Sequence, residues 1–163
     1  MNKLKLAKFI GTWFYVGLAP KAAGTFGSIA ALPFAWAIQA YLGNVALFVA
    51  SIIAFIGGVV ACNIYLPFTS SQDPREMVID AVAGQWFLLA FMPLTLKSYL
   101  VGLLLFRFFD ILKPYPISWA DKNIHGGFGV MFDDIMAAIY PLVIFALLYL
   151  LGYGSGIIAF LGS

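Results

Sequence analysis

Most ionisable side chains in the second half of this chain lie in residues 106–140, between two long apolar segments. Arg107, Asp110 and Lys113 recur at three-residue spacing near the end of one apolar run, and Asp133 and Asp134 precede the next one. A charged side chain next to hydrocarbon is energetically costly, so such residues are rare and usually serve a site or pair with one another. The spacing therefore predicts a functional site at the ends of apolar helices.

Four carboxylates from three predicted helix ends would meet at similar depth in such a site. They are Asp80, Asp110, Asp133 and Asp134. Hard oxygen ligands of this kind suit Mg²⁺, which binds through one or two carboxylates, waters and substrate phosphate oxygens. Arg107 and Lys113 would share the helix face of Asp110, and cations beside a metal are what a phosphate ester requires. The pattern therefore predicts Mg²⁺-assisted chemistry on a phosphate ester.

A purely structural interpretation exists for each of these pairs. Arg107 and Asp110 could form an intramembrane salt bridge that allows both to be buried. Asp133 and Asp134 could open a helix, where the macrodipole favours negative charge. His125, in a Gly-rich loop, could be an orienting or interfacial residue or a catalytic base. The convergence of four carboxylates and two cations at one depth favours a site over these alternatives.

A second candidate segment, KAAGTFGS at residues 21–28, precedes the first apolar span. Its backbone N–H groups and hydroxyls could bind an anion at a helix N-terminus, with Lys21 adding positive charge. On local sequence alone, the preferred interpretation is a Gly-rich turn with Thr25 or Ser28 as the helix cap.

The composition indicates an integral membrane protein. Hydrophobic residues make up 63% of the 163 residues, charged residues make up 10%, and the mean hydropathy is +0.99, which excludes an ordinary soluble domain. The net charge of +2 gives no argument for nucleic acid, so lipids and the bilayer are the expected partners. The single cysteine, Cys62, excludes an intramolecular disulfide and is predicted to be a packed residue.

The predicted fold is all-α, a polytopic membrane helix bundle that forms one domain over residues 1–163. About four or five membrane-embedded helices are expected, together with an interfacial helix over residues 1–18. The expected spans are 26–42, 44–66, 81–94, 98–112 and 134–152, of which the third and fourth are short for a bilayer.

Charge distribution predicts that the N-terminus and the connections 67–80 and 113–133 face the cytoplasm. Seven basic residues then obey the positive-inside rule, and Lys97 alone lies on the other side. The seven are Lys3, Lys5, Lys8, Lys21, Arg75, Lys113 and Lys122. This arrangement gathers the polar segments at the cytoplasmic headgroup level.

Three segments together resemble one family. They are AGTFGS at 23–28, VIDAVAGQW at 78–86 and FRFFDILKPYPISWADKNIHGGFGVMFDD at 106–134. In these segments, and in the spacing between them, the chain resembles phosphatidylglycerophosphatase A, a bacterial membrane phosphatase. The resemblance implies an all-helical, Mg²⁺-dependent enzyme of phospholipid biosynthesis in the bacterial inner membrane. It would hydrolyse phosphatidylglycerophosphate to phosphatidylglycerol and phosphate.

The combined reading assigns roles to two groups of residues. The expected catalytic group is Asp80, Ala81, Asp110, Asp133 and Asp134, whose four aspartates would also bind Mg²⁺. The expected substrate-binding residues are Lys21, Thr25, Ser28, Arg107, Lys113, Asn123 and His125. The nucleophile is open between a metal-activated water and a carboxylate such as Asp80, which would form a phosphoryl-enzyme.

Position 81 departs from the family's second motif, which reads Val-x-Asp-Glu where this chain has Asp80 followed by Ala81. Either an engineered substitution or a natural variant would explain the missing carboxylate. The resulting hypothesis is that this chain turns over poorly, whereas a version with glutamate at this position is active.

Two other classes of function are compatible with the sequence. A Mg²⁺-dependent phospholipid transferase would share the aspartates but usually carries them in a longer motif within one helix region. A small lipid transporter would more often place its charges near the midplane or show an internal repeat.

Overall fold

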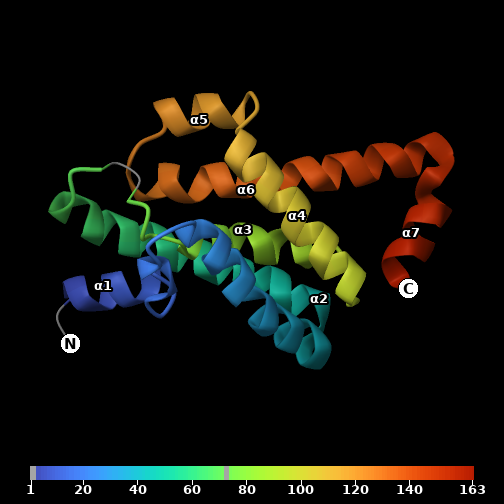
Figure 1. Cartoon of the computed structure of the whole chain (residues 1–163), viewed down its shortest axis with the longest axis horizontal. Helices are drawn as coiled ribbons and strands as arrows, with labels where there is room; N and C mark the ends of the chain where they lie inside the picture. Colours follow the sequence, from blue (N-terminus) through green and yellow to red (C-terminus); the bar gives the residue numbers. More distant parts are fainter. Residues whose placement is uncertain (1–2, 72–73) are drawn as a thin grey trace.

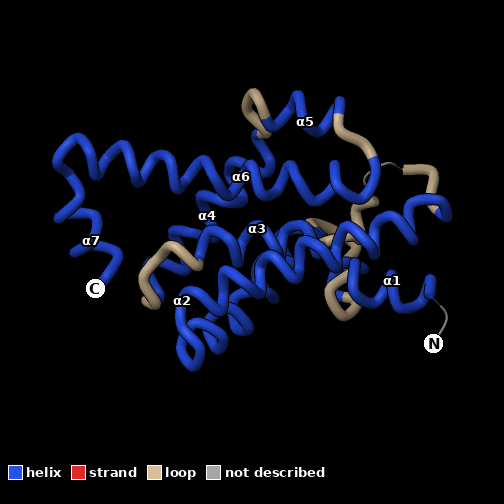
Figure 2. The backbone as a smooth tube through the Cα atoms, turned by 180° about the vertical axis from the view of Figure 1, so that it is seen from behind, coloured by secondary structure: helices blue, strands red, loops and turns tan. Residues whose placement is uncertain are grey.

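Helices make up almost all of the described chain, residues 3–71 and 74–163, in the computed structural model (Figures 1 and 2). Within these residues there is no β-strand, which agrees with the predicted all-α class. The helices are α1 (Lys3–Gly11), α2 (Ala23–Tyr65), α3 (Ile79–Leu89), α4 (Leu96–Leu112), α5 (Ile117–Asn123), α6 (Gly126–Leu148) and α7 (Gly154–Gly162). Short 3₁₀ turns occupy Val16–Leu18 and Leu66–Phe68, and a π-helical turn occupies Tyr149–Tyr153.

Helix α2 is a hairpin of two apolar legs rather than one straight rod (Figure 1). Gly43 has φ 86° and ψ 177°, a conformation that residues with a side chain rarely adopt, and the chain reverses there. The turn predicted between the spans 26–42 and 44–66 is therefore confirmed, and it depends on glycine.

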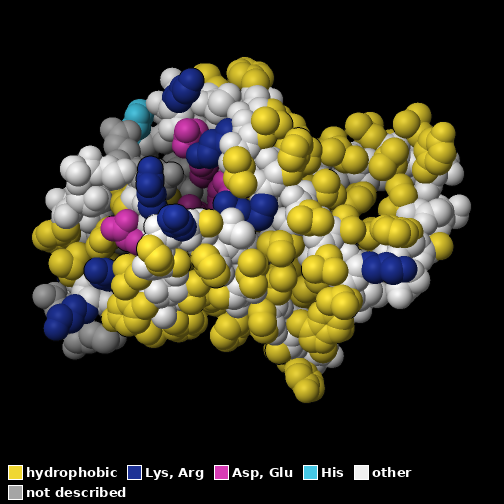
Figure 3. Space-filling view, viewed as in Figure 1, with side chains coloured by type: hydrophobic (Ala, Val, Ile, Leu, Met, Phe, Trp, Pro, Cys, Tyr) yellow, Lys and Arg dark blue, Asp and Glu magenta, His cyan; other side chains and the backbone are white. Residues whose placement is uncertain are grey.

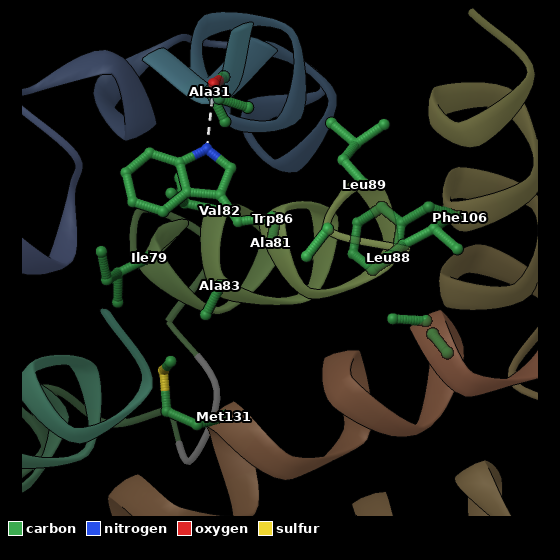
Figure 4. Close-up of a cluster of buried hydrophobic side chains, with 14 of the residues drawn as sticks. Ala31, Ile79, Ala81, Val82, Ala83, Trp86, Leu88, Leu89, Phe106 and Met131 are labelled. Carbon is green, nitrogen blue, oxygen red and sulfur yellow. Dashed lines mark hydrogen bonds between the residues drawn. The ribbon is translucent and has the colours of Figure 1, made fainter. Parts of the chain in front are cut away.

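Helix α3 is the short central helix of the bundle. Nine of its eleven residues are buried, and it packs against α2, α4 and α6 (Figure 4). The indole Nε1 of Trp86 donates a hydrogen bond to the carbonyl oxygen of Ala31, 2.9 Å away, and joins α3 to the first leg of α2. A Cβ atom on Gly84 would lie only 2.8 Å from the carbonyl oxygen of Asp134, so α3 and α6 are in backbone contact. This contact sets the positions of the acidic residues on both helices.

The predicted start of the last long helix was wrong. Helix α6 begins at Gly126 instead of residue 134, so Asp133 and Asp134 lie inside it and are not an N-terminal pair. Glycine disfavours helix, which is why HGGFG looked like a loop. Tertiary contact overrides this preference, because Gly127 donates its N–H to Asn63 Oδ1 at 2.8 Å and packs directly on the α2 backbone at Val59.

Large apolar side chains cover much of the outer surface (Figure 3). Tyr41 is 87% exposed, Leu150 79% and Leu104 69%. Extended apolar surface of this kind favours contact with lipid or another apolar partner over water. Helix occurs within each of the five predicted spans, but in the third, predicted over 81–94, helix α3 already ends at Leu89. Two segments, Ala23–Phe68 and Gly126–Gly162, are long and apolar enough to cross a membrane.

The N-terminal segment is a short helix followed by a tight reversal, whereas the sequence predicted one helix over residues 1–18. Helix α1 ends at Gly11, and Trp13, Phe14 and Tyr15 all have positive φ. Thr12 holds the reversal: its hydroxyl donates to the Lys8 carbonyl at 2.7 Å and accepts from the Tyr15 N–H at 3.1 Å. Residues 1 and 2 lie outside the described residues.

Candidate active site

A cavity of about 1180 Å³ opens where the polar ends of several helices meet. Figure 3 shows acidic side chains inside a hollow that is bordered by lysine and arginine side chains. The wall consists of residues 17–24, 74–77, 80–81, 107, 110–111, 113 and 133–134. Segments far apart in the sequence, from the start of α2 to the interior of α6, therefore share one polar chamber.

All four predicted carboxylates line this cavity. Asp133 and Asp134 are only 5% and 4% exposed. Asp134 lies close enough to Asp110, Asp80 and Asp133 to interact with all three electrostatically. The Ala81 N–H donates to Asp80 Oδ1 at 2.8 Å, and the Asp134 N–H donates to Asp133 Oδ1 at 3.0 Å. The structure thus brings together the acidic residues that the sequence singled out.

These carboxylates do not form a compact metal-ligand cluster in this structure. Within residues 3–71 and 74–163, no group of three or more Asp, Glu, His or Cys side chains has the arrangement needed to hold one metal ion. Asp110 and Asp133 instead accept hydrogen bonds from cationic side chains.

Arg107 and Lys113 supply the positive charge next to the carboxylates. Arg107 forms an ion pair with Asp110, one turn away on α4. Lys113 is the C-cap of α4, in a left-handed conformation with φ 42°, and Pro114 follows it. Its Nζ lies 2.6 Å from Asp133 Oδ2 and 2.8 Å from Asp121 Oδ1. The predicted end of the helix near Lys113 is confirmed.

The charge of Lys113 is stabilised by its neighbours. Burial by itself would lower the pKa of the ammonium group, but the carboxylates of Asp133 and Asp121 outweigh that effect and raise the pKa above its ordinary value. Lys113 therefore stays protonated throughout the physiological pH range and presents a fixed positive charge to the cavity.

The segment 21–28 contributes backbone and one lysine to the wall. Lys21 and Gly24 line the cavity, and a Cβ atom on Gly24 would lie 3.1 Å from Arg107 Nη1. The absence of a side chain at Gly24 thus lets the guanidinium approach the first turn of α2. Ser28 is fully buried and donates its hydroxyl to the Gly24 carbonyl at 3.0 Å, and Thr25 is not among the lining residues.

Asn123 and His125 lie outside the cavity wall. Asn123 donates its Nδ2 to the Trp119 carbonyl at 2.7 Å, within α5. His125 is exposed and is the N-cap residue of α6. The structure therefore places neither side chain with the carboxylates, and their predicted substrate contacts stay predictions.

Three charged residues of the site, Arg75, Glu76 and Asp121, were not identified as site residues from the sequence, and Glu76 lines the cavity next to Arg75. Asp121 binds the Lys113 ammonium, and Arg75 lines the cavity from the segment that precedes α3. Asp121 lies in the same polar stretch as Lys113, eight residues later in the sequence. This proximity could have indicated Asp121 as a site residue. Arg75 had no such signal, because its position depends on the contact between the backbone of the neighbouring Glu76 and Gly17.

Comparison with known proteins shows the family of the chain. The family model described as phosphatidylglycerophosphatase A matches residues 9–149, which include every cavity-lining residue. A phosphatidylglycerophosphatase A of Escherichia coli is 31% identical over 156 residues, covering 93% of this chain and 88% of that protein. The Haemophilus influenzae protein of the same name is 36% identical over 138 residues, covering 83% and 85%.

A third relative is named for a different lipid substrate. A Bacteroides thetaiotaomicron protein, provisionally named phosphatidylinositol-3-phosphatase, is 34% identical over 154 residues, covering 86% of this chain and 92% of that protein. No solved structure matches the chain significantly. The family and all three relatives are phosphatases by name, which leaves the transferase and transporter alternatives without support. The chain is therefore a phosphatase of the phosphatidylglycerophosphatase A family.

Proposed function

We propose that the protein hydrolyses phosphatidylglycerophosphate to phosphatidylglycerol and inorganic phosphate in a Mg²⁺-dependent reaction. The observation that carries this proposal is the cavity in which the four aspartates Asp80, Asp110, Asp133 and Asp134 meet Arg107 and Lys113. Two relatives with 31% and 36% identity over most of the chain bear the name of this activity. The lipid headgroup would enter the cavity while the acyl chains remain in the bilayer.

The donor set fits Mg²⁺, although no three ligands are gathered among the described residues. Mg²⁺ commonly keeps several waters and binds through only one or two carboxylates and the substrate phosphate. Asp80, Asp110, Asp133 and Asp134 would hold the ion. When bound, Mg²⁺ would polarise the phosphoryl group and neutralise part of its charge.

The side chains of the chain itself have separate roles in this proposal. Arg107 and Lys113 stabilise negative charge that develops on the phosphoryl oxygens, in a cavity where burial strengthens such interactions. Asp121 and Asp133 hold the Lys113 ammonium in place at 2.8 Å and 2.6 Å. Asp110 does the same for the Arg107 guanidinium.

The attacking group is either a water molecule or the Asp80 carboxylate. A phosphoryl-enzyme on Asp80 would transfer label from ³²P-labelled substrate to the protein, whereas direct attack by water leaves the protein unlabelled. Acid quenching during turnover, followed by detection of protein-bound label, distinguishes the two routes.

Ala81 is proposed to impair the reaction. The residue is buried, with 1% exposure, and it lines the cavity directly beside Asp80. A methyl group cannot ligate a metal ion or accept a proton from water, whereas a glutamate there would add a further carboxylate directly beside Asp80. This chain should therefore turn over slowly and gain activity on substitution with glutamate.

The proposed topology is multi-pass, with the cavity on the cytoplasmic side of the bacterial inner membrane. The two legs of α2, together with α4 and α6, would cross the bilayer, and the short α3 with residues 90–94 would make a fifth embedded element. The cations around the cavity agree with the positive-inside rule. Lys97, at the start of α4, lies far from them, 5.3 Å from the ring centre of Phe160 in α7.

Phosphate release from phosphatidylglycerophosphate in detergent tests the proposal. The comparison uses this chain, Ala81→Glu, and Ala81→Gln as a control that matches the size of glutamate without its charge. The expected result is a large gain for Ala81→Glu, little gain for Ala81→Gln, and loss of all activity in EDTA. Failure of all three proteins to release phosphate would refute the assigned activity, and equal turnover by all three would refute the impairment.

Phosphatidylinositol 3-phosphate is a second candidate substrate, because one relative is named for its hydrolysis. Both lipids carry a phosphomonoester on a headgroup that is joined to the lipid through a phosphodiester. Running the same assay with each lipid gives the preference directly, and the proposal predicts faster release from phosphatidylglycerophosphate.

A further inference from the structure

The cavity contains two cations that the proposed chemistry does not require. Lys21 lies in the segment before α2, Arg75 lies in the segment before α3, and both line the cavity while remaining exposed. Within the described part of the chain, neither forms an ion pair, whereas Arg107 and Lys113 are engaged by carboxylates. Arg107 and Lys113 therefore form an inner pair of cations whose charges are balanced by carboxylates. Lys21 and Arg75 form an outer pair that is available to a ligand.

The segments that carry the outer pair are fixed against each other. A Cβ atom on Gly17 would lie 2.0 Å from the Glu76 carbonyl oxygen, so the two backbones are in close contact. The Val78 N–H donates a hydrogen bond to the Gly11 carbonyl at 2.8 Å. The backbone segments that carry Lys21 and Arg75 are therefore packed against each other and form one rim of the cavity. The side chains of both residues are exposed to solvent.

The proposed substrate has two phosphates with different chemistry. Its terminal monoester is the group to be hydrolysed and must lie at the inner carboxylates. Its phosphodiester, one glycerol unit away, joins the headgroup to the diacylglycerol and must lie nearer to the opening through which the acyl chains leave. A phosphodiester keeps its negative charge at all physiological pH values, and a cavity of about 1180 Å³ has room for both groups.

We propose that Lys21 and Arg75 bind the phosphodiester and thereby select lipids that carry a diester in addition to the monoester. Phosphatidic acid has a terminal monoester without a diester, so it lacks the group that this rim recognises. The inference rests on the proposed function, since it assumes that the monoester lies at the carboxylates. Arg75 can donate two hydrogen bonds to one phosphate, and Lys21 contributes a point charge.

Equilibrium binding tests this selectivity without turnover. Binding of phosphatidylglycerophosphate and of phosphatidic acid in detergent micelles is measured in EDTA for this chain and for Lys21→Ala/Arg75→Ala. The control is Lys5→Ala/Lys122→Ala, which removes the same charge from exposed positions outside the cavity wall.

The expected result is a roughly tenfold weaker affinity of Lys21→Ala/Arg75→Ala for phosphatidylglycerophosphate, with phosphatidic acid affected less than about twofold. The control should leave the ratio of the two affinities unchanged. Because Lys21 and Arg75 are exposed, raising the salt concentration should also reduce the preference of the parent chain. Equal weakening for both lipids, or no weakening for either, would overturn the inference.

The hydrolysis assay with Ala81→Glu separates this inference from the proposed function. If Ala81→Glu releases no phosphate while the binding preference still depends on the two cations, the hydrolysis proposal fails and the recognition site stands. If phosphate is released and the preference is unaffected by the double substitution, hydrolysis stands and the recognition site is refuted.

Discussion

The contact between α3 and α6 at Gly84 gives the sharpest prediction about how the fold supports the site. Gly84→Ala would place a methyl group 2.8 Å from the Asp134 carbonyl oxygen and 2.7 Å from Phe106 Cε2. A carbon and a carbonyl oxygen ordinarily approach no closer than about 3.3 Å, so the two helices must separate by roughly 0.5 Å. The backbone oxygen cannot rotate away as a flexible side chain would.

Overpacking of this kind typically costs about 1–3 kcal/mol of folding free energy. For a chain of this size, each kcal/mol lowers Tm by roughly 3 °C, so the expected decrease is roughly 3–9 °C. The same displacement moves Asp80 on α3 relative to Asp134 on α6. Misplacement of catalytic groups by ~1 Å costs on the order of 100-fold in rate, so a displacement of half that size should still reduce turnover clearly.

Gly57 provides the matched control, since a Cβ atom there would meet nothing within 4 Å and the residue also lies inside a helix. Gly57→Ala should leave Tm unchanged or raise it, because alanine is favoured over glycine in a helix by up to about 1 kcal/mol. Thermal unfolding in detergent and phosphate release are measured for both substitutions in the Ala81→Glu protein. If Gly84→Ala unfolds at the same temperature as Gly57→Ala and keeps its turnover, the close α3–α6 contact is refuted.

Two other predictions concern the wall of the cavity. The pKa of Lys113 is raised by Asp133 and Asp121, so the stability that these pairs add should be fully present below the ordinary lysine pKa of 10.5 and lost as pH rises through the raised value. Unfolding of the parent chain and of Lys113→Met as a function of pH checks this, and a difference that vanishes near neutral pH would contradict it. Ser28→Ala removes the hydrogen bond to the Gly24 carbonyl and should destabilise the protein by about 0.5–1.5 kcal/mol in chemical or thermal unfolding. Unchanged stability combined with a raised KM would instead assign Ser28 to substrate binding.

The acidic and basic residues that α3, α4 and α6 bring to the cavity could be predicted from the sequence because they interrupt apolar segments or stand at their ends. In such a setting, a charge such as Asp110 or Lys113 needs a partner or a function, so residue type and position carry most of the information. Hydropathy predicted a turn between the apolar spans 26–42 and 44–66, and the structure places it at Gly43.

The remaining features depend on contacts between distant segments, which local sequence does not encode. The start of α6 was misplaced because the helix over Gly126 and Gly127 is stabilised by Asn63, more than sixty residues earlier. Arg75 joined the cavity wall through the packing of its segment against Gly17. Neither relationship leaves a periodic or compositional signal in the chain.

The most direct test of the central claim is phosphate release by Asp134→Asn in the Ala81→Glu protein. Asp134 is buried in the cavity and interacts with the other three carboxylates, while asparagine keeps its size and removes its charge. We expect Mg²⁺-dependent release from phosphatidylglycerophosphate to fall by roughly 100-fold or more, while the protein remains folded as judged by its Tm. Turnover within about twofold of the Ala81→Glu parent would contradict the assignment of this cavity as the active site.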